Sequence, residues 1–507
     1  MLFLINKKVI TAGSIFRQFI RKIRISTFFL LIFGMSCFSQ ETDFWLQISS
    51  AKDQELWDLV VQPDGYLYAI GTQADTTIDF DKDTESFIFK INTTGQITDS
   101  AVFSIPDRRL SLRLIKIDGQ DSLLILGFST DTSENNFNTR LELYRINNQF
   151  QIIDHASCLI AEDRNPFWVY VDKYNPETYV IAGATFSALP GPFLRAFYLK
   201  VSAGLDSLLF WEYPELNRAN LTSIIKQLND STIWACESNV YGENINLMDT
   251  LFNHLDFMKI PDRISDNFGI KWVNDKSFYL LGEWSGDSPE DDVGIIRMFD
   301  PIDTTGHLFT SWGTVDTFDF PAVTNGLDFR NIDSIFAGGT TNLSLGNWGY
   351  SYFFLTQYDS MLNLRWERFY GGDGYYQLYK VVATDDGGCI MAGTRNEGNY
   401  TWLERDPVII KVNNEGYIIS TPETPVLQAR EAIVYPNPGN DILNIRLARQ
   451  HPKARFFIFD AAGRSVLSQQ LDGPINQIDT RSLPAGSYFY KITSSKGLNE
   501  SGVWIRK

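Results

Sequence analysis

A unit of about 55 residues recurs seven times between residues 66 and 416. In each copy a turn rich in Asn, Asp, Gly or Pro precedes an apolar strand that a small residue closes, a pattern typical of β-hairpins. Seven copies with about four strands each predict an all-β fold, a seven-bladed β-propeller over residues 40–419. A solenoid of sheets is the less favoured alternative. The closing residues are Gly71, Gly127, Gly183, Cys236, Gly282, Gly338 and Gly393.

The third strand of each unit carries a polar residue in one column. A ring of cations there could bind an anionic glycan. The alternative is a structural residue that pairs with a neighbouring acid in every blade. Repetition favours this second interpretation, because functional sites are usually asymmetric. The column contains Lys90, Arg145, Lys200, Lys259, Arg297, Gln357 and Lys411.

The segment 43–48, before the first unit, looks like a detached fourth strand, because its sequence DFWLQI is similar to LRWERF at 364–369. We expect it to complete the last blade, which would remove exposed sheet edges. The units also resemble the propeller repeats of secreted bacterial proteins, as in Asp386-Gly387-Gly388 and Ala392-Gly393. That resemblance implies a fold and no catalysis.

The first 39 residues are typical of a secretory signal peptide. They contain six basic residues and no acidic one, then an apolar run at 25–35 and Ser39 before a cleavage position. A lipoprotein signal using Cys37 is an alternative. Loss of this segment changes the formal net charge from −17 to −23. Such an acidic chain argues against nucleic acid as a partner.

The composition changes after residue 419. Residues 420–430 form a linker rich in Pro and Thr. Residues 431–507 contain short strands about ten residues apart, which predict a small Ig-like β-sandwich. The predicted strands are Asp441–Leu447, Ala454–Phe459, Ser465–Leu471, Gln477–Ile478, Ser487–Thr493 and Gly502–Ile505.

Several short motifs follow one another in this tail. Their defining residues are Tyr435, Pro436, Asn437, Pro438, Asp460, Gly463, Gly486, Tyr488, Lys491 and the terminal Lys507. Together they closely resemble the type A C-terminal sorting domain of the type IX secretion system of Gram-negative bacteria. The resemblance implies export through an outer-membrane translocon. It also implies removal of the tail near 425–430 by a sortase-like peptidase, which releases the protein or joins it to surface lipopolysaccharide.

The sequence contains no recognisable catalytic constellation. Its mature histidines lie in different units without metal-ligand spacing, and no Gly-x-Ser-x-Gly elbow or phosphate-binding loop is present. Cys158, Cys236 and Cys389 are expected as small core residues, with a disulfide between two of them left open. We therefore expect a binding or adhesion module at the cell surface or in the medium. The alternative is a hydrolase or lyase acting on extracellular polysaccharide.

Two groups of residues are candidate sites. Asp79, Asp81 and Asp83 alternate in an acidic loop and could ligate Ca²⁺, although a solvated loop is the favoured interpretation; no other cofactor is expected. The loops between second and third strands gather on one face of a propeller, so we predict that glycans or extracellular proteins bind there. The aromatic candidates of that face are Trp284, Trp348, Tyr350 and Trp402.

Overall fold

The computed structural model describes part of the second of two compact units, which are residues 1–41 and 42–507. The predicted signal peptide and the linker, apart from Arg430, lie outside the described residues. Within the described ranges the chain has no apolar helix of membrane-spanning length. The structure describes residues 43–507 except for 76–83, 120, 133–138, 161–163, 188–192, 213–220, 230, 240–241, 262–263, 275, 285–291, 301–304, 314–316, 344–349, 398–403, 419–429, 449–450 and 496–497.

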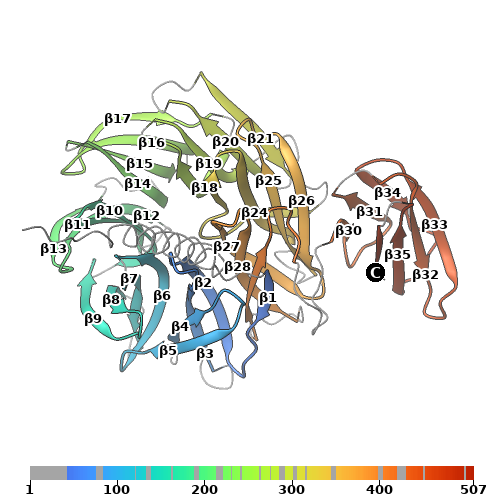
Figure 1. Cartoon of the computed structure of the whole chain (residues 1–507), viewed down its shortest axis with the longest axis horizontal. Helices are drawn as coiled ribbons and strands as arrows, with labels where there is room; N and C mark the ends of the chain where they lie inside the picture. Colours follow the sequence, from blue (N-terminus) through green and yellow to red (C-terminus); the bar gives the residue numbers. More distant parts are fainter. Residues whose placement is uncertain are drawn as a thin grey trace, which may run out of the picture. The chain divides into compact units, whose positions relative to one another are not determined.

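Seven antiparallel sheets follow one another along the chain from β1 to β29 (Figure 1). Six have four strands, and the sixth has five because its first strand is split into β22 and β23. The prediction of an all-β propeller with seven blades is confirmed.

The strands of the first four blades are these. Blade one has β2 (Asp53–Val61), β3 (Leu67–Ala74), β4 (Glu85–Ile91) and β5 (Ile97–Phe103). Blade two has β6 (Arg108–Ile117), β7 (Ser122–Asp131), β8 (Thr139–Asn147) and β9 (Ile152–Leu159). Blade three has β10 (Arg164–Asn175), β11 (Thr178–Ser187), β12 (Phe193–Ser202) and β13 (Ser207–Glu212). Blade four has β14 (Leu221–Asn229), β15 (Thr232–Asn239), β16 (Gly242–Asp249) and β17 (His254–Lys259).

The last three blades complete the propeller. Blade five has β18 (Ile264–Trp272), β19 (Phe278–Trp284), β20 (Asp292–Met298) and β21 (His307–Trp312). Blade six has β22 (Phe318–Pro321), β23 (Leu327–Asn331), β24 (Ser334–Leu343), β25 (Tyr352–Tyr358) and β26 (Leu364–Gly371). Blade seven has β27 (Tyr375–Ala383), β28 (Cys389–Asn396) and β29 (Asp406–Val412), and β1 (Phe44–Gln47) is its fourth strand.

The ring closes as predicted from the segment at 43–48. Strand β1 pairs antiparallel with β29, so that Phe44 lies opposite Lys411 and Gln47 opposite Val408. The first strand of every blade also contacts the first strand of the next, and β27 contacts β2. These first strands are therefore the innermost strands. Closure gives blade seven its fourth strand and gives each blade a neighbour on both sides.

The recurring glycine allows a bulge in the innermost strand. The register of this strand shifts by one residue at Trp57, Arg113 and Tyr379 in blades one, two and seven. The bulged backbone then approaches the second strand so closely that a Cβ atom at Gly71 or Gly127 would clash with a carbonyl oxygen. Only glycine lacks that atom. In blade six Gly339, rather than the predicted Gly338, lies against the first strand in this way.

One strand prediction in the propeller is wrong. The sequence placed the third strand of blade four at 256–260, with Lys259 in the polar column, but the third strand is β16 and Lys259 ends the fourth strand, β17. Leu247 of β16 occupies the position of the polar column. It lies opposite Trp234 of the second strand, as Lys90 lies opposite Tyr68 in blade one.

The recurring cation links one blade to the next. In three blades the cation, and in blade six Gln357, donates a side-chain hydrogen bond to a backbone carbonyl in the turn that follows the third strand of the next blade. The predicted pairing with an acid is not repeated in every blade, since Leu247 holds the position in blade four; it is present for Arg145 with Asp118 and Lys411 with Asp386, both at 2.8 Å. The cross-blade bonds are Arg145 to Ala203, Lys200 to Thr250 at 3.0 Å, Arg297 to Ser360 and Gln357 to Asn414 at 3.2 Å.

The turns that accept these bonds share one geometry. A side-chain oxygen at the first position accepts two backbone N–H groups, as Asp249 does from Leu251 at 2.8 Å and Asn253 at 2.9 Å. The residue at the fourth position of the turn has a positive φ. In blade four this residue is Phe252, with φ of 66°. That conformation costs a large residue about 1–3 kcal/mol. Burial of the Phe252 ring against Tyr198 of blade three, at 5.1 Å between centroids, offsets the cost.

The tail is a sandwich of two sheets. One sheet has the order β30 (Ala432–Tyr435), β31 (Ile442–Leu447), β34 (Ile475–Asp479). The other has β33 (Ser465–Leu471), β32 (Ala454–Phe459), β35 (Gly486–Thr493), β36 (Asn499–Arg506). All six predicted strands are present, and β30 is an additional one. The core between the sheets includes Leu443, Ile458 and Trp504, each fully buried.

The tail also contacts blade six. Arg446 in β31 forms a two-pronged ion pair with Glu367 in β26, at 3.2 Å from Nε to Oε1 and 2.7 Å from Nη2 to Oε2. Its guanidinium lies 4.5 Å from the ring centroid of Trp312, whose indole N–H also donates to Glu367 at 2.7 Å. Ile433 and Tyr435 of β30 belong to the same buried cluster as the blade-six core.

Candidate functional site

The bulges of three neighbouring blades bring Tyr379, Trp57 and Arg113 together where the innermost strands meet. The guanidinium carbon of Arg113 lies 3.3 Å from the ring centroid of Trp57. The Trp57 and Tyr379 rings meet edge to face at 5.1 Å. Bulges re-aim side chains and are common beside functional sites. We name these three residues, with Glu55 and Arg405, the channel cluster.

Arg405 holds the acidic groups of this region. It binds Asp53 with Nε at 3.0 Å and Nη2 at 2.7 Å, and Nη1 lies 2.8 Å from Glu55. The Tyr379 hydroxyl also donates to Glu55. Burial by itself lowers the pKa of the Arg405 guanidinium, but the hydrogen bonds to Asp53 and the charge of Glu55 outweigh burial and raise that pKa. Both carboxylates are therefore ion-paired.

Arg113 lacks such partners. Its Nε donates to Ser111 Oγ at 2.6 Å, and its two terminal nitrogens have no hydrogen bond to any residue that the structure describes. Burial lowers the pKa of the Arg113 guanidinium to about 10, because the charge of Glu55 offsets the lost hydration only in part. The channel cluster thus contains one saturated guanidinium and one with free donors.

Charged pairs beside the cluster join neighbouring blades. Lys380 in β27 forms an ion pair with Asp58 in β2, and Asp58 Oδ2 accepts the backbone N–H of Ile115 in β6 at 2.9 Å. Lys271 and Asp328 repeat this ion pair between blades five and six. Because each aspartate binds both a cation and a backbone donor, we interpret these pairs as structural links.

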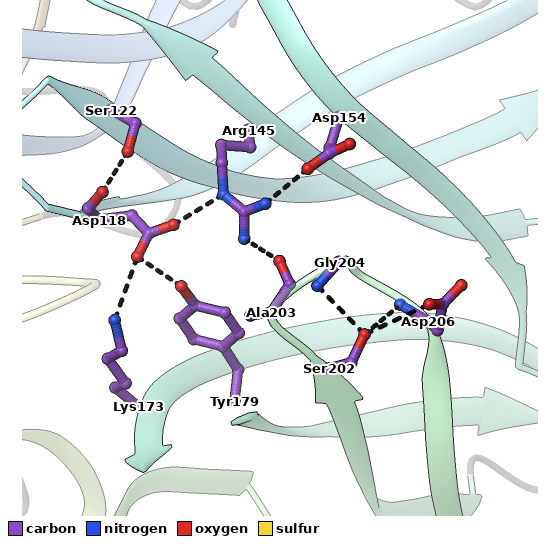
Figure 2. Close-up of polar contacts among 10 residues, drawn as sticks. All are labelled: Asp118, Ser122, Arg145, Asp154, Lys173, Tyr179, Ser202, Ala203, Gly204 and Asp206. Carbon is purple, nitrogen blue, oxygen red and sulfur yellow. Dashed lines mark hydrogen bonds and ion pairs between the residues drawn. The ribbon is translucent and has the colours of Figure 1, made fainter. Parts of the chain in front are cut away.

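A second polar cluster joins blades two and three (Figure 2). Asp118 accepts hydrogen bonds from the Tyr179 hydroxyl, from Arg145 Nε at 2.8 Å and from Lys173 Nζ at 3.4 Å. Burial alone raises the pKa of Asp118, but these donors outweigh it and lower that pKa. Burial and the adjacent carboxylate raise the pKa of Tyr179 to about 12. Arg145 continues the network to Asp154 at 2.6 Å.

A cavity of about 70 Å³ adjoins this network, with Lys116, Val171 and Tyr179 in its wall. Ligand pockets are usually about 300–1,000 Å³, whereas a water molecule occupies about 30 Å³ of liquid. The cavity thus has room for a few water molecules. Since the polar groups of Figure 2 bind one another, we interpret the region as a blade junction.

The residues predicted from sequence as ligand sites are only partly described. Asp79, Asp81, Asp83, Trp348 and Trp402 lie outside the described residues, so the calcium site and most of the aromatic face stay predictions.

The two described aromatic candidates have local contacts. The Trp284 ring packs on Phe309 of its own blade at 5.6 Å, and the Tyr350 carbonyl accepts a hydrogen bond from Asn342 at 2.6 Å. Neither makes a contact with the channel cluster among the interactions of the described residues. The three cysteines that the structure describes form no disulfide with one another: Cys236 and Cys389 are buried and Cys158 is half-buried, as expected for core residues.

The motif at 435–439 holds the last strand of the tail. Trp504 Nε1 donates to the Pro436 carbonyl at 3.0 Å. The Asn437 amide donates to the Val503 carbonyl at 2.8 Å and accepts the N–H of Ile505 at 3.0 Å. The neighbouring motif residues are Tyr435, fully buried, Pro438 and the terminal Lys507, whose N–H donates to the Gly439 carbonyl at 2.9 Å.

The other tail motifs form turns. Asp460 accepts two backbone N–H groups at 2.9 and 3.0 Å, and Gly463 in the same turn has φ of 75°. These backbone bonds, with the Arg464 side chain, lower the pKa of Asp460. Gly486 begins β35 with φ of 154°, and the Tyr488 hydroxyl donates to the Pro484 carbonyl at 2.7 Å. Lys491 is an exposed residue of the same strand.

Comparison with protein families matches residues 433–505 to the family described as the secretion system C-terminal sorting domain. These residues form a type IX secretion sorting domain. The protein is therefore secreted through the type IX system to the cell surface or the medium, and its tail is handled by that machinery. No curated protein sequence matches the chain.

Solved structures that share the strand arrangement have low similarity. PorZ, a surface component of the type-IX secretion system of Porphyromonas gingivalis, is 11% identical with a TM-score of 0.23, covering 91% of this chain and 100% of PorZ. The WD40 domain of SCAP from fission yeast is 8% identical with a TM-score of 0.35, covering 75% and 96%. A neuraminidase-like N10 protein of a bat influenza A subtype is 7% identical with a TM-score of 0.36, covering 72% and 97%. At these values the propeller assignment rests on the strand pairing.

Proposed function

We propose that the secreted chain is a binding or adhesion protein whose propeller recognises an extracellular ligand through the channel cluster. The observation that supports this proposal is the meeting of Trp57, Tyr379 and Arg113 from three different blades. Trp57 and Arg113 are half-buried, whereas Tyr379 is buried and supports the Trp57 ring. The indole ring and a guanidinium with free donors offer apolar contact area and directed hydrogen bonds at one place. Binding sites usually combine these two features.

A hydrolase acting on polysaccharide is less well supported. Glycosidases need one carboxyl group that is protonated at working pH and a second that is ionised. Glu55 of the channel cluster and the adjacent Asp53 are both ion-paired with Arg405, at 2.8 and 2.7 Å. Both carboxylates are thus bound by a cation of the protein rather than free to contact a substrate.

The route of export completes the proposal. The tail would be recognised by the translocon of the type IX system, and a sortase-like peptidase would cut near residues 425–430. The propeller would then be released or joined to surface lipopolysaccharide.

A combined binding and turnover screen tests the proposed function. The chain from residue 40 to 507 is applied to glycan and protein arrays, and polysaccharides that bind are assayed for new reducing ends. We expect binding without bond cleavage, with Trp57→Ala reducing binding at least tenfold and Phe257→Ala, at an exposed position of the outer strand β17, serving as the control. Turnover of a bound polysaccharide would contradict the proposal and favour the enzyme.

A further inference from the structure

We propose that Arg113 binds the carboxylate of an acidic sugar residue in the ligand. This inference rests on the proposed function, since it specifies the chemistry of a ligand for the channel cluster.

The first argument is the uncompensated charge. Arg405 forms ion pairs with Asp53 and Glu55, whereas Arg113 forms none with any described residue. Arg113 is half-buried, and stacking on Trp57 at 3.3 Å replaces part of its hydration. A guanidinium that no described acid neutralises can bind an anionic group of a ligand.

The second argument is the orientation of the free donors. Ser111 Oγ binds Nε at 2.6 Å, and the Trp57 ring fixes the plane of the guanidinium. The two terminal nitrogens are left as a planar fork, which matches the two oxygens of a carboxylate.

The third argument concerns the rest of the ligand. The half-buried Trp57 presents a rigid ring beside the fork, and the buried Tyr379 ring supports it edge to face. The C–H faces of sugar rings pack on such aromatic surfaces. The protein is exported to the cell surface or medium, where acidic polysaccharides are accessible. A sugar that carries one carboxylate would bind the terminal nitrogens of Arg113 through that group and pack its ring on the aromatic surface.

A paired array tests the inference. The chain from residue 40 to 507 is bound to uronic-acid oligosaccharides and to the same oligosaccharides with each carboxyl group reduced to an alcohol. We expect at least tenfold weaker binding to the reduced forms. Arg113→Gln should lower binding of the acidic forms to that level, while Arg365→Gln, at an exposed position of β26, should leave it unchanged.

The failures are distinguishable. Binding of neutral glycans or proteins that Arg113→Gln does not change would overturn this inference and leave the proposed function standing. Equal binding of acidic and reduced forms, or binding of acidic peptides alone, would also overturn it. Binding of no probe at all would contradict the proposed function together with the inference.

Stability gives an independent readout. Without ligand, Arg113→Met should not lower the melting temperature of the chain, because it keeps the packing on Trp57 and removes only a half-buried charge that no described residue pairs. A lower melting temperature would show that Arg113 is a structural residue that stabilises the Trp57 ring, and would overturn the inference.

Discussion

The propeller and the tail of this chain use their recognisable residues differently. In the tail, the residues that mark the sorting domain are also those that hold its last strand, as Asn437 and Pro436 do. In the propeller, the repeated residues only build blades, as Gly71 does by admitting a bulge. The candidate ligand contacts are the residues that differ between blades, such as Trp57 and Arg113 at bulges of the same kind. In a repeat protein, functional residues are therefore expected at positions whose residue differs from one repeat to the next.

The variant with the largest expected effect tests whether export needs the tail motif because the motif stabilises the folded tail. Trp504 is fully buried and its N–H is bonded to Pro436. Trp504→Ala should destabilise the tail by about 3–5 kcal/mol, and secretion should be lost. Export of the variant is measured in cells, and unfolding of the chain by calorimetry. Val503→Ala, at an exposed neighbouring position, is the control. If the variant with an unfolded tail were exported normally, the secretion machinery would recognise the motif residues without the folded domain.

A second change tests whether the two regions are coupled. Glu367→Ala leaves the Arg446 guanidinium buried without its carboxylate partner. We expect a loss of about 3 kcal/mol in the free energy of unfolding. Replacing both partners, with Glu367→Leu and Arg446→Met, should recover most of it. If the single and double variants unfold alike, the two regions are energetically independent.

A third prediction concerns pH and is confined to the tail. Burial raises the pKa of Glu500 to about 7, with the N–H of Glu431 bound at 2.6 Å as a smaller opposing effect. Because the folded pKa is above the unfolded value, this group favours the folded state fully below about pH 4.5, and the contribution is lost as pH rises toward 7. Glu500→Gln should stabilise the tail by about 2 kcal/mol at pH 8 and have little effect at pH 4. Chemical unfolding at the two pH values measures this difference, and equal effects at both would contradict it.

The smallest effect tests the link between blades. Gln357 makes the same cross-blade bond as the cations do. Lys200→Gln should therefore cost less than about 0.5 kcal/mol, whereas Lys200→Ala should cost about 1 kcal/mol through loss of the bond to Thr250. Denaturant midpoints of the two variants are compared with that of the parent chain. An equal loss in both would show that the positive charge matters more than the hydrogen bond.

Much of the fold could be predicted from sequence because it repeats. Turn residues and small closing residues mark the blades, and the likeness of 43–48 to 364–369 predicts the closure that pairs Phe44 with Lys411. Blade four was misread because it lacks the closing glycine and its third strand carries Leu247 where the other blades have a polar residue.

The channel cluster could not be predicted. Trp57 and Tyr379 are more than 300 residues apart, and they meet only because a bulge turns each one in its own blade. The cross-blade bonds were missed for a related reason. Their acceptors are backbone carbonyls, which any residue provides, so the sequence contains no signal for them.

The most direct test of the account separates export from binding in one experiment. The parent chain, Trp57→Ala and Asn437→Ala are compared for secretion from cells and, after purification from residue 40 onward, for array binding. Trp57→Ala should be secreted normally and lose binding, while Asn437→Ala should lose secretion and bind normally. If Trp57→Ala binds as the parent does, or if both variants lose the same activity, the assignment of recognition to the propeller channel and of export to the tail is wrong.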